Sequence, residues 1–527
     1  MRRFQTPGRS PVFAENGICA TSHPLAAKVA VAMLEQGGNA VDAALAGSAV
    51  LGIAEPQMTG LGGDCFALIK APGDTRIVAL NGSGRAPAGL SAQDLRAAGH
   101  RTMPLNGVAA VTVPGAVDAF CRLSGDYGLK GLDDVLAPAI HYAEAGVPVA
   151  PRVAADWAEA KGWLQGVARD YYLHDRRPPR AGTLFRHPRQ AEVLRRIAAE
   201  GRAGFYEGEV AEDMVASLRA LGGTHTAEDF AATASAYGEP VSGDYRGMEL
   251  VEHPPNGQGA TAILMANILS HFDLGVLDPF CADRAHLEVE AAKLAYDARN
   301  RFLADPDHVT RLAHMLDPAT GKALAGLIDR NRAAPNPAAL AEAVHRDTIY
   351  ITVIDRDRMA VSLICSIFHS FGSGLASDRF GILFQNRGAG FTLEAGHPNE
   401  AGGGKRPMHT IIPGMLRKGG RLDTAFGVMG GQYQPCGHVR FMSNMVDFGM
   451  DPQTAIDGPR LFPQPGGPLM VEDGYSDAVM QNLSNRGHEV ARPPFGLGGA
   501  QAIRIHHDIG VLEGGSDPRK DGCALGY

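Results

Sequence analysis

The chain has 527 residues, of which 45% are hydrophobic, and its formal net charge at pH 7 is −8. This acidic balance argues against nucleic acid or an anionic membrane surface as the main partner. No window of the sequence is long and apolar enough to cross a bilayer, and the 66 glycines and 34 prolines indicate many tight connections rather than disorder.

The N-terminal stretch does not read as a secretory signal. Basic residues at positions 2, 3 and 9 have no apolar segment behind them, which favours a cytoplasmic location. The seven cysteines, at positions 19, 65, 121, 281, 365, 436 and 523, are odd in number and include no CxxC pair. We therefore expect reduced, mostly buried thiols.

Helical patterns dominate the first part of the chain. A helix is predicted over 24–36, beginning after Ser22 as its cap and ending at a Gly-Gly stop. The later expected elements are a buried Ala-rich helix at 41–53, strands at 66–70 and 76–80, a mainly helical region over 115–235 with a solvent-facing basic loop at 176–180, a helix at 286–302, and a mobile segment over 329–346.

A β-hairpin is predicted immediately after that segment. Residues 349–354 are β-branched or aromatic at every position, which favours a buried strand. Residues 355–358 read as a polar turn and 359–366 as the returning strand.

Two registers of this hairpin remain open. If Ile354 pairs with Met359, Thr348 lies opposite Cys365, and one more loop residue would put Thr348 opposite Ser366 instead. Either register brings a second hydroxyl close to Thr348. By itself the pattern is also typical of two core strands with incidental hydroxyl groups.

Motifs distributed along the chain carry a family resemblance. They occupy residues 17–26 (GICATSHPLA), 37–44 (GGNAVDAA), 55–64 (EPQMTGLGGD), 113–115 (VPG), 405–407 (KRP), 427–431 (GVMGG) and 516–522 (SDPRKDG). In order and spacing the sequence resembles the gamma-glutamyltranspeptidase family from about residue 14 to the C-terminus.

The resemblance implies an α+β fold, the four-layer αββα sandwich of the N-terminal-nucleophile (Ntn) hydrolases. Members of the family are proenzymes that cut themselves before a threonine. Carried over, the cut falls between Asp347 and Thr348 and yields a large subunit 1–347 and a small subunit 348–527, which together build one intertwined globular domain. These two subunits are the expected protein partners, and a higher oligomer is left open.

The same resemblance assigns the catalytic roles. Thr348 becomes the nucleophile, and its new α-amino group, which titrates near 8, serves as base for its own hydroxyl. Ser366 takes the place of a supporting hydroxyl that is usually a threonine. Gly430 and Gly431 match the glycine pair that stabilises the oxyanion.

No cofactor and no metal are expected. The nearest metal-ligand candidate, His506-His507-Asp508, lies in a strand-like run without helical ligand spacing, which favours surface histidines.

The substrate-binding positions depart from the family pattern. The family's carboxylate-binding arginine corresponds to Ser83, with an arginine two residues later at Arg85. Its amine-binding asparagine corresponds to Phe368, and the run 385–391 (QNRGAGF) lacks the family's aspartate. Two serines that help to hold the carboxylate correspond to His409 and Thr410.

These changes suit an acidic or carbonyl-rich ligand without an amine, because a desolvated ammonium needs an anionic or carbonyl acceptor. The expected substrate-binding residues are Arg85, Asn386, Arg387, His409 and Thr410. Arg85 is expected to supply the main charge for a carboxylate, and a structural salt bridge is the alternative for Arg387. The variant set is similar to the transferase-like subgroup that includes cephalosporin acylases and oxamate amidohydrolase.

We therefore interpret the sequence as a self-processing amidohydrolase that acts on an amide of a small carboxylate-bearing substrate, oxamate being one example, through an acyl-enzyme at Thr348. One alternative is a genuine gamma-glutamyltransferase or glutathione hydrolase that holds the glutamyl group with different residues. The other is an uncleaved, non-catalytic relative that only binds a small acid.

Overall fold

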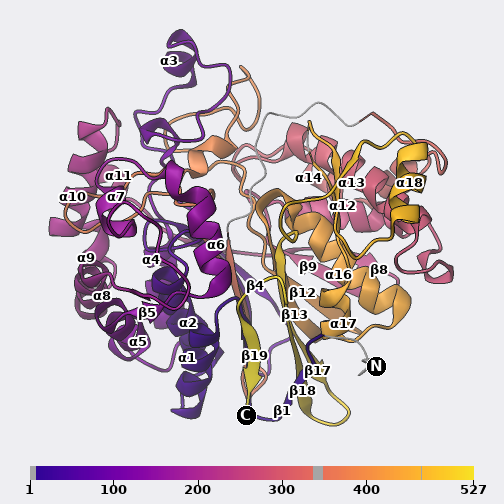
Figure 1. Ribbon diagram of the computed structural model, residues 1–527, viewed down its shortest axis with the longest axis horizontal. Helices are drawn as coiled ribbons and strands as arrows, with labels where there is room; N and C mark the ends of the chain where they lie inside the picture. Colours follow the sequence, from indigo (N-terminus) through magenta and orange to yellow (C-terminus); the bar gives the residue numbers. More distant parts are fainter. Residues whose placement is uncertain (1–7, 336–347, 465) are drawn as a thin grey trace.

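Two antiparallel sheets of seven strands each lie face to face in the centre of the molecule, between two helical layers (Figure 1). The computed structural model describes residues 8–335, 348–464 and 466–527. The first sheet consists, in spatial order, of β1 (Val12–Ala14), β18 (Val511–Ser516), β17 (Gly499–His506), β13 (Arg421–Met429), β12 (Gly414–Lys418), β9 (Met248–Glu252) and β8 (Val241–Tyr245).

The second sheet interleaves strands from both sides of residue 348. In spatial order it contains β19 (Cys523–Gly526), β2 (Ile18–Thr21), β10 (Ile349–Ile354), β11 (Ala360–Ser366), β3 (Asp64–Lys70), β4 (Val78–Gly82) and β7 (Ala236–Gly238). Because β10 pairs with both β2 and β11, the segments before and after residue 348 share one sheet. Two small sheets comprise β5 (Val147–Pro148) with β6 (Leu184–Phe185), and β14 (Leu461–Pro463) with β15 (Leu469–Val471) and β16 (Val490–Ala491).

One helical layer covers the second sheet, on the left in Figure 1, where α1 and α2 pack on β2 and β10. The helices of this half of the chain are α1 (Pro24–Glu35), α2 (Ala40–Ala54), α3 (Ala92–Ala97), α4 (Ala116–Tyr127), α5 (Leu132–Ala145), α6 (Pro151–Ala160), α7 (Ala168–Tyr172), α8 (Pro188–Glu200), α9 (Ala203–Tyr206), α10 (Gly208–Ala220) and α11 (Ala227–Ala231). Gly47 of α2 has no room for a side chain, because a Cβ there would lie 2.5 Å from Ile351 Cδ1 of β10.

The other helical layer covers the first sheet, with α12 on β8 and β9 and α16 on β13. Its helices are α12 (Gly259–Leu269), α13 (Ala282–Phe302), α14 (Leu312–Leu316), α15 (Pro318–Ala325), α16 (Gln434–Phe448), α17 (Pro452–Asp457) and α18 (Asp477–Asn485). Short 3₁₀ turns occupy η1 (Val108–Ala110), η2 (Lys161–Trp163), η3 (Leu274–Val276), η4 (Arg387–Gly390) and η5 (Gly431–Tyr433).

Three apolar layers hold the sandwich together. Each helical layer has its own core against the sheet below it. A third core lies between the two sheets and includes Ile18, Leu68, Ile354, Met415 and Ile503. Burial of aliphatic side chains on both faces of β10 and β11 explains why their sequences are apolar without alternation.

The predicted hairpin is confirmed, and the structure selects one of its two registers. Ile354 pairs with Ala360 and Ile349 with Cys365, so the loop is one residue longer than the shorter option and Thr348 lies opposite Ser366. Asp355 causes the extra loop residue, because its Oδ1 accepts hydrogen bonds from the amides of Asp357 and Met359, both at 3.0 Å.

Several predicted boundaries differ from the observed ones, since β3 begins at Asp64 rather than at residue 66 and α13 begins at Ala282 rather than at residue 286. The cap of α1 is His23, whose Nδ1 accepts a hydrogen bond from Leu25 N, whereas the predicted cap, Ser22, donates its hydroxyl to Glu55 at 2.6 Å. The strand expected at 76–80 begins at Val78, because Arg76 N donates to Asp74 Oδ1 and extends the turn.

Two further expectations from the sequence concern the state of the cysteines and the presence of membrane-spanning segments. All seven cysteines are free thiols, and Cys19, Cys65, Cys365 and Cys436 are buried. Of the helices that the structure describes, none combines the length and apolar character needed to span a bilayer.

We expect the folded protein to lose stability in mild acid, because several of its histidines are buried in the neutral form. Burial is the main cause that lowers the pKa to about 4 for His23, His187, His225, His253 and His369, and to about 3 for His409 and His488. The unfolded chain takes up these protons near pH 6.5 and the folded chain does not, so stability falls as pH drops from about 6.5 towards 4. Each such group contributes on the order of 1 kcal/mol per pH unit in that window.

Thermal unfolding midpoints at pH 7.5, 6 and 5 test this expectation, and we expect a progressive fall. Glu55 acts in the opposite direction, since burial raises its pKa to about 7 and its ionisation costs stability as pH rises. A midpoint that stays constant or increases from pH 7.5 to pH 5 would contradict the dominance of the histidines.

Candidate functional site

Two hydroxyl groups meet where β10 begins and β11 ends. Thr348 Oγ1 donates to Ser366 Oγ over 3.4 Å, and both residues are buried. Ser366 Oγ also accepts a hydrogen bond of 2.8 Å from the amide of Phe368. The loop after β11 therefore orients the serine hydroxyl, which in turn is a hydrogen-bond partner for Thr348. Asp347 and residues 336–346 of the segment expected to be mobile lie outside the described residues.

The glycine pair follows β13 and leads through η5 into α16. Gly430 has φ +123° and Gly431 φ +55°, which L-residues with side chains rarely adopt. A Cβ on Gly430 would also lie 3.0 Å from the Cα of Gly498. The backbone amides of Gly430 and Gly431 lie just before the N-terminus of the 15-residue helix α16, where the helix dipole favours negative charge.

Contacts between the two sheets place the hydroxyl pair near this turn. Ser362 Oγ donates to Phe426 O at 3.1 Å, and Tyr350 packs with Met429. From Ser362 to Ser366 the hairpin thus advances in the same direction as β13 does from Phe426 towards Gly430. The hydroxyl pair and the glycine pair consequently lie towards the same end of the sandwich.

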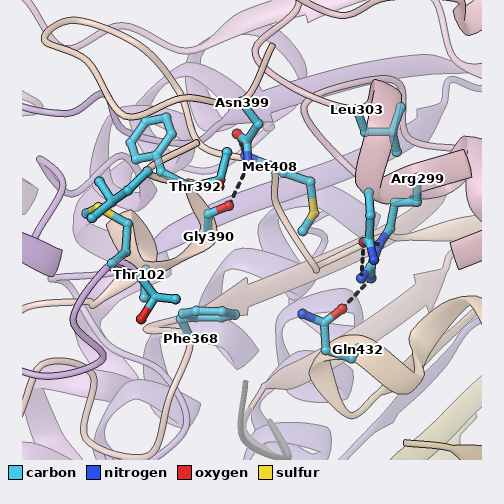
Figure 2. Close-up of a pocket in the computed structure, with 14 residues that line it drawn as sticks. Thr102, Arg299, Leu303, Phe368, Gly390, Thr392, Asn399, Met408 and Gln432 are labelled. Carbon is cyan, nitrogen blue, oxygen red and sulfur yellow. Dashed lines mark hydrogen bonds between the residues drawn. The ribbon is translucent and has the colours of Figure 1, made fainter. Parts of the chain in front are cut away.

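A cavity of about 80 Å³ is lined in part by residues that lie close in sequence to both pairs (Figure 2). Phe368, two residues after Ser366, lines one side, and Gln432, directly after Gly431, lines the other. The other lining residues are Thr102, Met103, Arg299, Asn300, Leu303, Ala389, Gly390, Phe391, Thr392, Leu393, Asn399 and Met408. These described lining residues include one arginine and no carboxylate, so the cavity is suited to a small anion rather than a cation.

Arg387 is a second cation next to the cavity. Its side chain is fully buried, and its guanidinium lies 4.2 Å from the ring centroid of Phe368. Nη1 donates to Thr410 Oγ1 at 3.0 Å, whereas Nε and Nη2 have no hydrogen-bond partner among the described residues. Burial lowers the pKa of Arg387 to about 9, which still leaves it charged at neutral pH. The charge of the nearby Asp64 carboxylate opposes this shift, but no hydrogen-bonded salt bridge to Nε or Nη2 of Arg387, the structural alternative considered for it, is formed by the described residues.

The ring of Phe368 lies between this guanidinium and the cavity. The backbone of Phe368 has an unusual conformation. Its φ is +79°, in the left-handed region, which is unfavourable for a bulky side chain and well tolerated by asparagine and glycine. A phenylalanine at this position therefore contributes no polar group to the cavity and retains backbone strain.

His409 is hydrogen-bonded to Asp64, a residue for which the sequence suggested no separate role. Its Nε2 donates to Asp64 Oδ2 at 3.0 Å, and its Nδ1 accepts from Ile411 N at 3.3 Å. Burial, followed by the charge of Arg387, lowers the pKa of His409 to about 3, so its ring is neutral. Asp64 Oδ1 also accepts from Gly84 N, Gly115 N and Gln385 Nε2. An acidic residue at the start of an otherwise apolar strand was the sequence signal for this buried hub.

The other predicted ligand residues occupy different surroundings. Asn386 joins two loops, because its Oδ1 accepts from His369 N at 3.0 Å and its Nδ2 donates to Leu105 O at 2.6 Å. The Arg85 side chain is 43% exposed, lies outside the described cavity lining, and contacts Asp305 Oδ2 at 3.3 Å. The structure does not test its expected role as the main carboxylate ligand, and Arg387, which lies against Phe368 of the cavity lining, is the competing candidate.

Histidine clusters elsewhere are occupied by protein partners. His506 Nε2 pairs with Glu513 at 2.8 Å, and His507 Nε2 donates to Leu422 O at 2.7 Å. His286, Glu290 and His488 could together face a metal ion, but the Lys293 ammonium already lies 2.7 Å from Glu290. A second cation there would be repelled by this lysine.

Comparisons with known proteins agree on one family. The family model described as gamma-glutamyltranspeptidase matches residues 26–527. The glutathione hydrolase-like YwrD proenzyme of Bacillus subtilis is 37% identical over 96% of this chain and 97% of its own length. The oxamate amidohydrolase proenzyme of Klebsiella pneumoniae is 33% identical over 97% of this chain and 98% of its own length.

A solved structure extends this agreement to the fold. The crystal structure of cephalosporin acylase from Bacillus halodurans has a TM-score of 0.93 and 37% identity, covering 100% of this chain and 99% of that one. The predicted αββα sandwich of the Ntn hydrolases is therefore confirmed.

Proposed function

Because the chain belongs to the gamma-glutamyltranspeptidase family, whose members act on C–N amide bonds, we propose that it is a self-processing amidohydrolase for a small amide with a carboxylate on its acyl part. Cleavage between Asp347 and Thr348 would release the amine of Thr348. An oxamate-type amide is our candidate substrate, and the similarity to a protein named oxamate amidohydrolase supports that class.

The reaction divides into acylation and deacylation. The Thr348 amine accepts the proton of its own hydroxyl as Oγ1 attacks the amide carbonyl carbon. The amides of Gly430 and Gly431 stabilise the resulting oxyanion. The C–N bond then breaks, and the leaving amine takes up the proton. In deacylation the Thr348 amine accepts a proton from water as the water attacks the ester carbonyl, which restores the Thr348 hydroxyl and releases the acyl group as a carboxylate. With oxamate as substrate the products would be ammonia and oxalate.

The charge around the cavity is the observation that carries this proposal. Two buried arginines lie at the cavity: Arg299 is part of its lining, and Arg387 lies behind Phe368. The described lining contains no carboxylate, and two nitrogens of Arg387 have no hydrogen-bond partner among the described residues. An unpaired buried charge is costly, whereas a carboxylate can accept two parallel hydrogen bonds from one guanidinium. The volume of about 80 Å³ is far below the roughly 300 Å³ at which sites for drug-sized ligands begin, which supports a small substrate.

We therefore assign the substrate carboxylate to Arg387, reached by rotation of the Phe368 ring. Replacing Arg387 with methionine should reduce kcat/KM for oxamate by about 10- to 150-fold, mainly through KM, as expected for a lost charge-assisted contact of about 1.5–3 kcal/mol. Thermal stability should stay the same or increase, because the variant removes a poorly paired buried charge. Ammonia release and thermal unfolding midpoints measure the two effects.

Arg85→Met is the matched control, with an expected KM within about threefold of the unaltered enzyme, since exposed ion pairs contribute little. The reverse result, a raised KM in Arg85→Met alone, would return the carboxylate to Arg85. If neither variant changes KM for any carboxylate-bearing amide, the proposed substrate class is wrong.

A further inference from the structure

One face of α13 contacts the segment that follows the glycine pair. Tyr296 and Arg299 lie three residues apart on this helix; the Tyr296 hydroxyl donates to Gln432 O and Arg299 Nη1 donates to Gln432 Oε1. Figure 2 shows Arg299 extending from its helix towards Gln432 beside the cavity. The residue directly after Gly431 is thus held through both its main chain and its side chain.

Gln258 extends this contact to Gly431 itself. Its Oε1 accepts from Arg299 Nη1 at 2.8 Å, and its Nε2 donates to Gly431 O at 3.0 Å and Thr410 O at 2.6 Å. Because arginine only donates hydrogen bonds, Arg299 fixes which end of the Gln258 amide faces the two carbonyls. Without it the amide could rotate and present its oxygen to Gly431 O, which would be repulsive.

The charge of Arg299 is not neutralised within the described residues. It is buried, and within the described residues its hydrogen bonds go to the amide oxygens of Gln258, Gln432 and Asn300. Burial lowers its pKa to about 10, so it is cationic at neutral pH. A fixed positive charge beside the glycine pair would stabilise negative charge that develops there during the reaction.

We propose that Arg299 is a positioning residue for the oxyanion site. Through Gln258 and Gln432 it holds Gly430 and Gly431 in their positive-φ conformation, and its charge favours the tetrahedral intermediate over the bound substrate. This inference rests on the proposed function, because it takes the glycine pair as the oxyanion site of that amidohydrolase.

Steady-state kinetics of the fully processed enzyme test the role. Arg299→Met should lower kcat by about 10²- to 10³-fold, the loss typical of a missing oxyanion contact, with KM changed less than about threefold. In Arg299→Ala, added guanidinium ions should restore part of kcat, which repair of general packing would not explain. Arg301→Met, on the same helix but with an exposed ion pair to Asp297, is the control expected to leave both constants unchanged.

The coupling to Gln258 provides a second measurement. If Arg299 acts through Gln258, the double variant Arg299→Met/Gln258→Leu should lose little more kcat than the more impaired single variant. Full additivity, a raised KM with unchanged kcat, or an unchanged kcat would each overturn the inference while leaving the amidohydrolase intact. Failure of the unaltered, processed enzyme to release amine from any carboxylate-bearing amide would instead refute the proposed function.

Discussion

Replacing Thr348 with alanine is expected to leave one uncut chain, whereas the unaltered protein should separate into fragments spanning residues 1–347 and 348–527. The hydroxyl that lies 3.4 Å from Ser366 Oγ is the group that would attack the preceding peptide carbonyl, and alanine removes it. The variant should also have no amidase activity above background. A denaturing gel and the intact mass of the purified protein measure the first effect, and amine release measures the second.

Thr348→Ser is the matched control, because it keeps a hydroxyl at the same position and should still cleave, although more slowly. N-terminal sequencing of the small fragment defines the cut. A first residue other than residue 348, or normal cleavage of Thr348→Ala, would show that the nucleophile has been assigned wrongly. An unaltered protein that never cleaves would favour the non-catalytic, acid-binding alternative.

The sequence predicted the elements of this hairpin more reliably than its register. The β-branched and aromatic run 349–354 is incompatible with a surface segment, and in the structure it forms a fully buried interior strand of the second sheet. The register depended on one loop residue, and the Asp355 carboxylate decides it by bonding to two turn amides. Such a local side-chain contact is not visible in hydrophobic periodicity.

Motifs in the sequence suggested some residues of the candidate site, whereas residues that are defined by contacts between distant segments could not be found in this way. Thr348, Ser366 and the glycine pair occur in recognisable stretches, and the structure brings them to one end of the sandwich. Arg299 reads in the sequence as one more charge on a helix. Its relation to Gln258 and Gln432 requires three segments that are far apart in the chain to fold together.

Gamma-glutamyl compounds are expected to be poor substrates of this enzyme. Their α-ammonium group needs an anionic or carbonyl acceptor once it is desolvated, and Phe368 and Gly390 stand at the two positions where the family resemblance expects partners. The described cavity lining contains no carboxylate, and Arg299 and Arg387 would repel an ammonium. Two missing charge-assisted contacts, at about 1.5–3 kcal/mol each, correspond to a loss of about 10²- to 10⁴-fold in kcat/KM.

The measurement compares kcat/KM for gamma-glutamyl-p-nitroanilide with that for small carboxylate amides on the same processed enzyme. Phe368→Asn should raise turnover of the glutamyl compound, since asparagine suits φ +79° and offers a carbonyl to the ammonium. Phe368→Leu, which also shortens the side chain but supplies no acceptor, should not. Efficient hydrolysis of the glutamyl compound by the unaltered enzyme would favour the glutathione hydrolase alternative, with the ammonium held by residues other than those at positions 368 and 390.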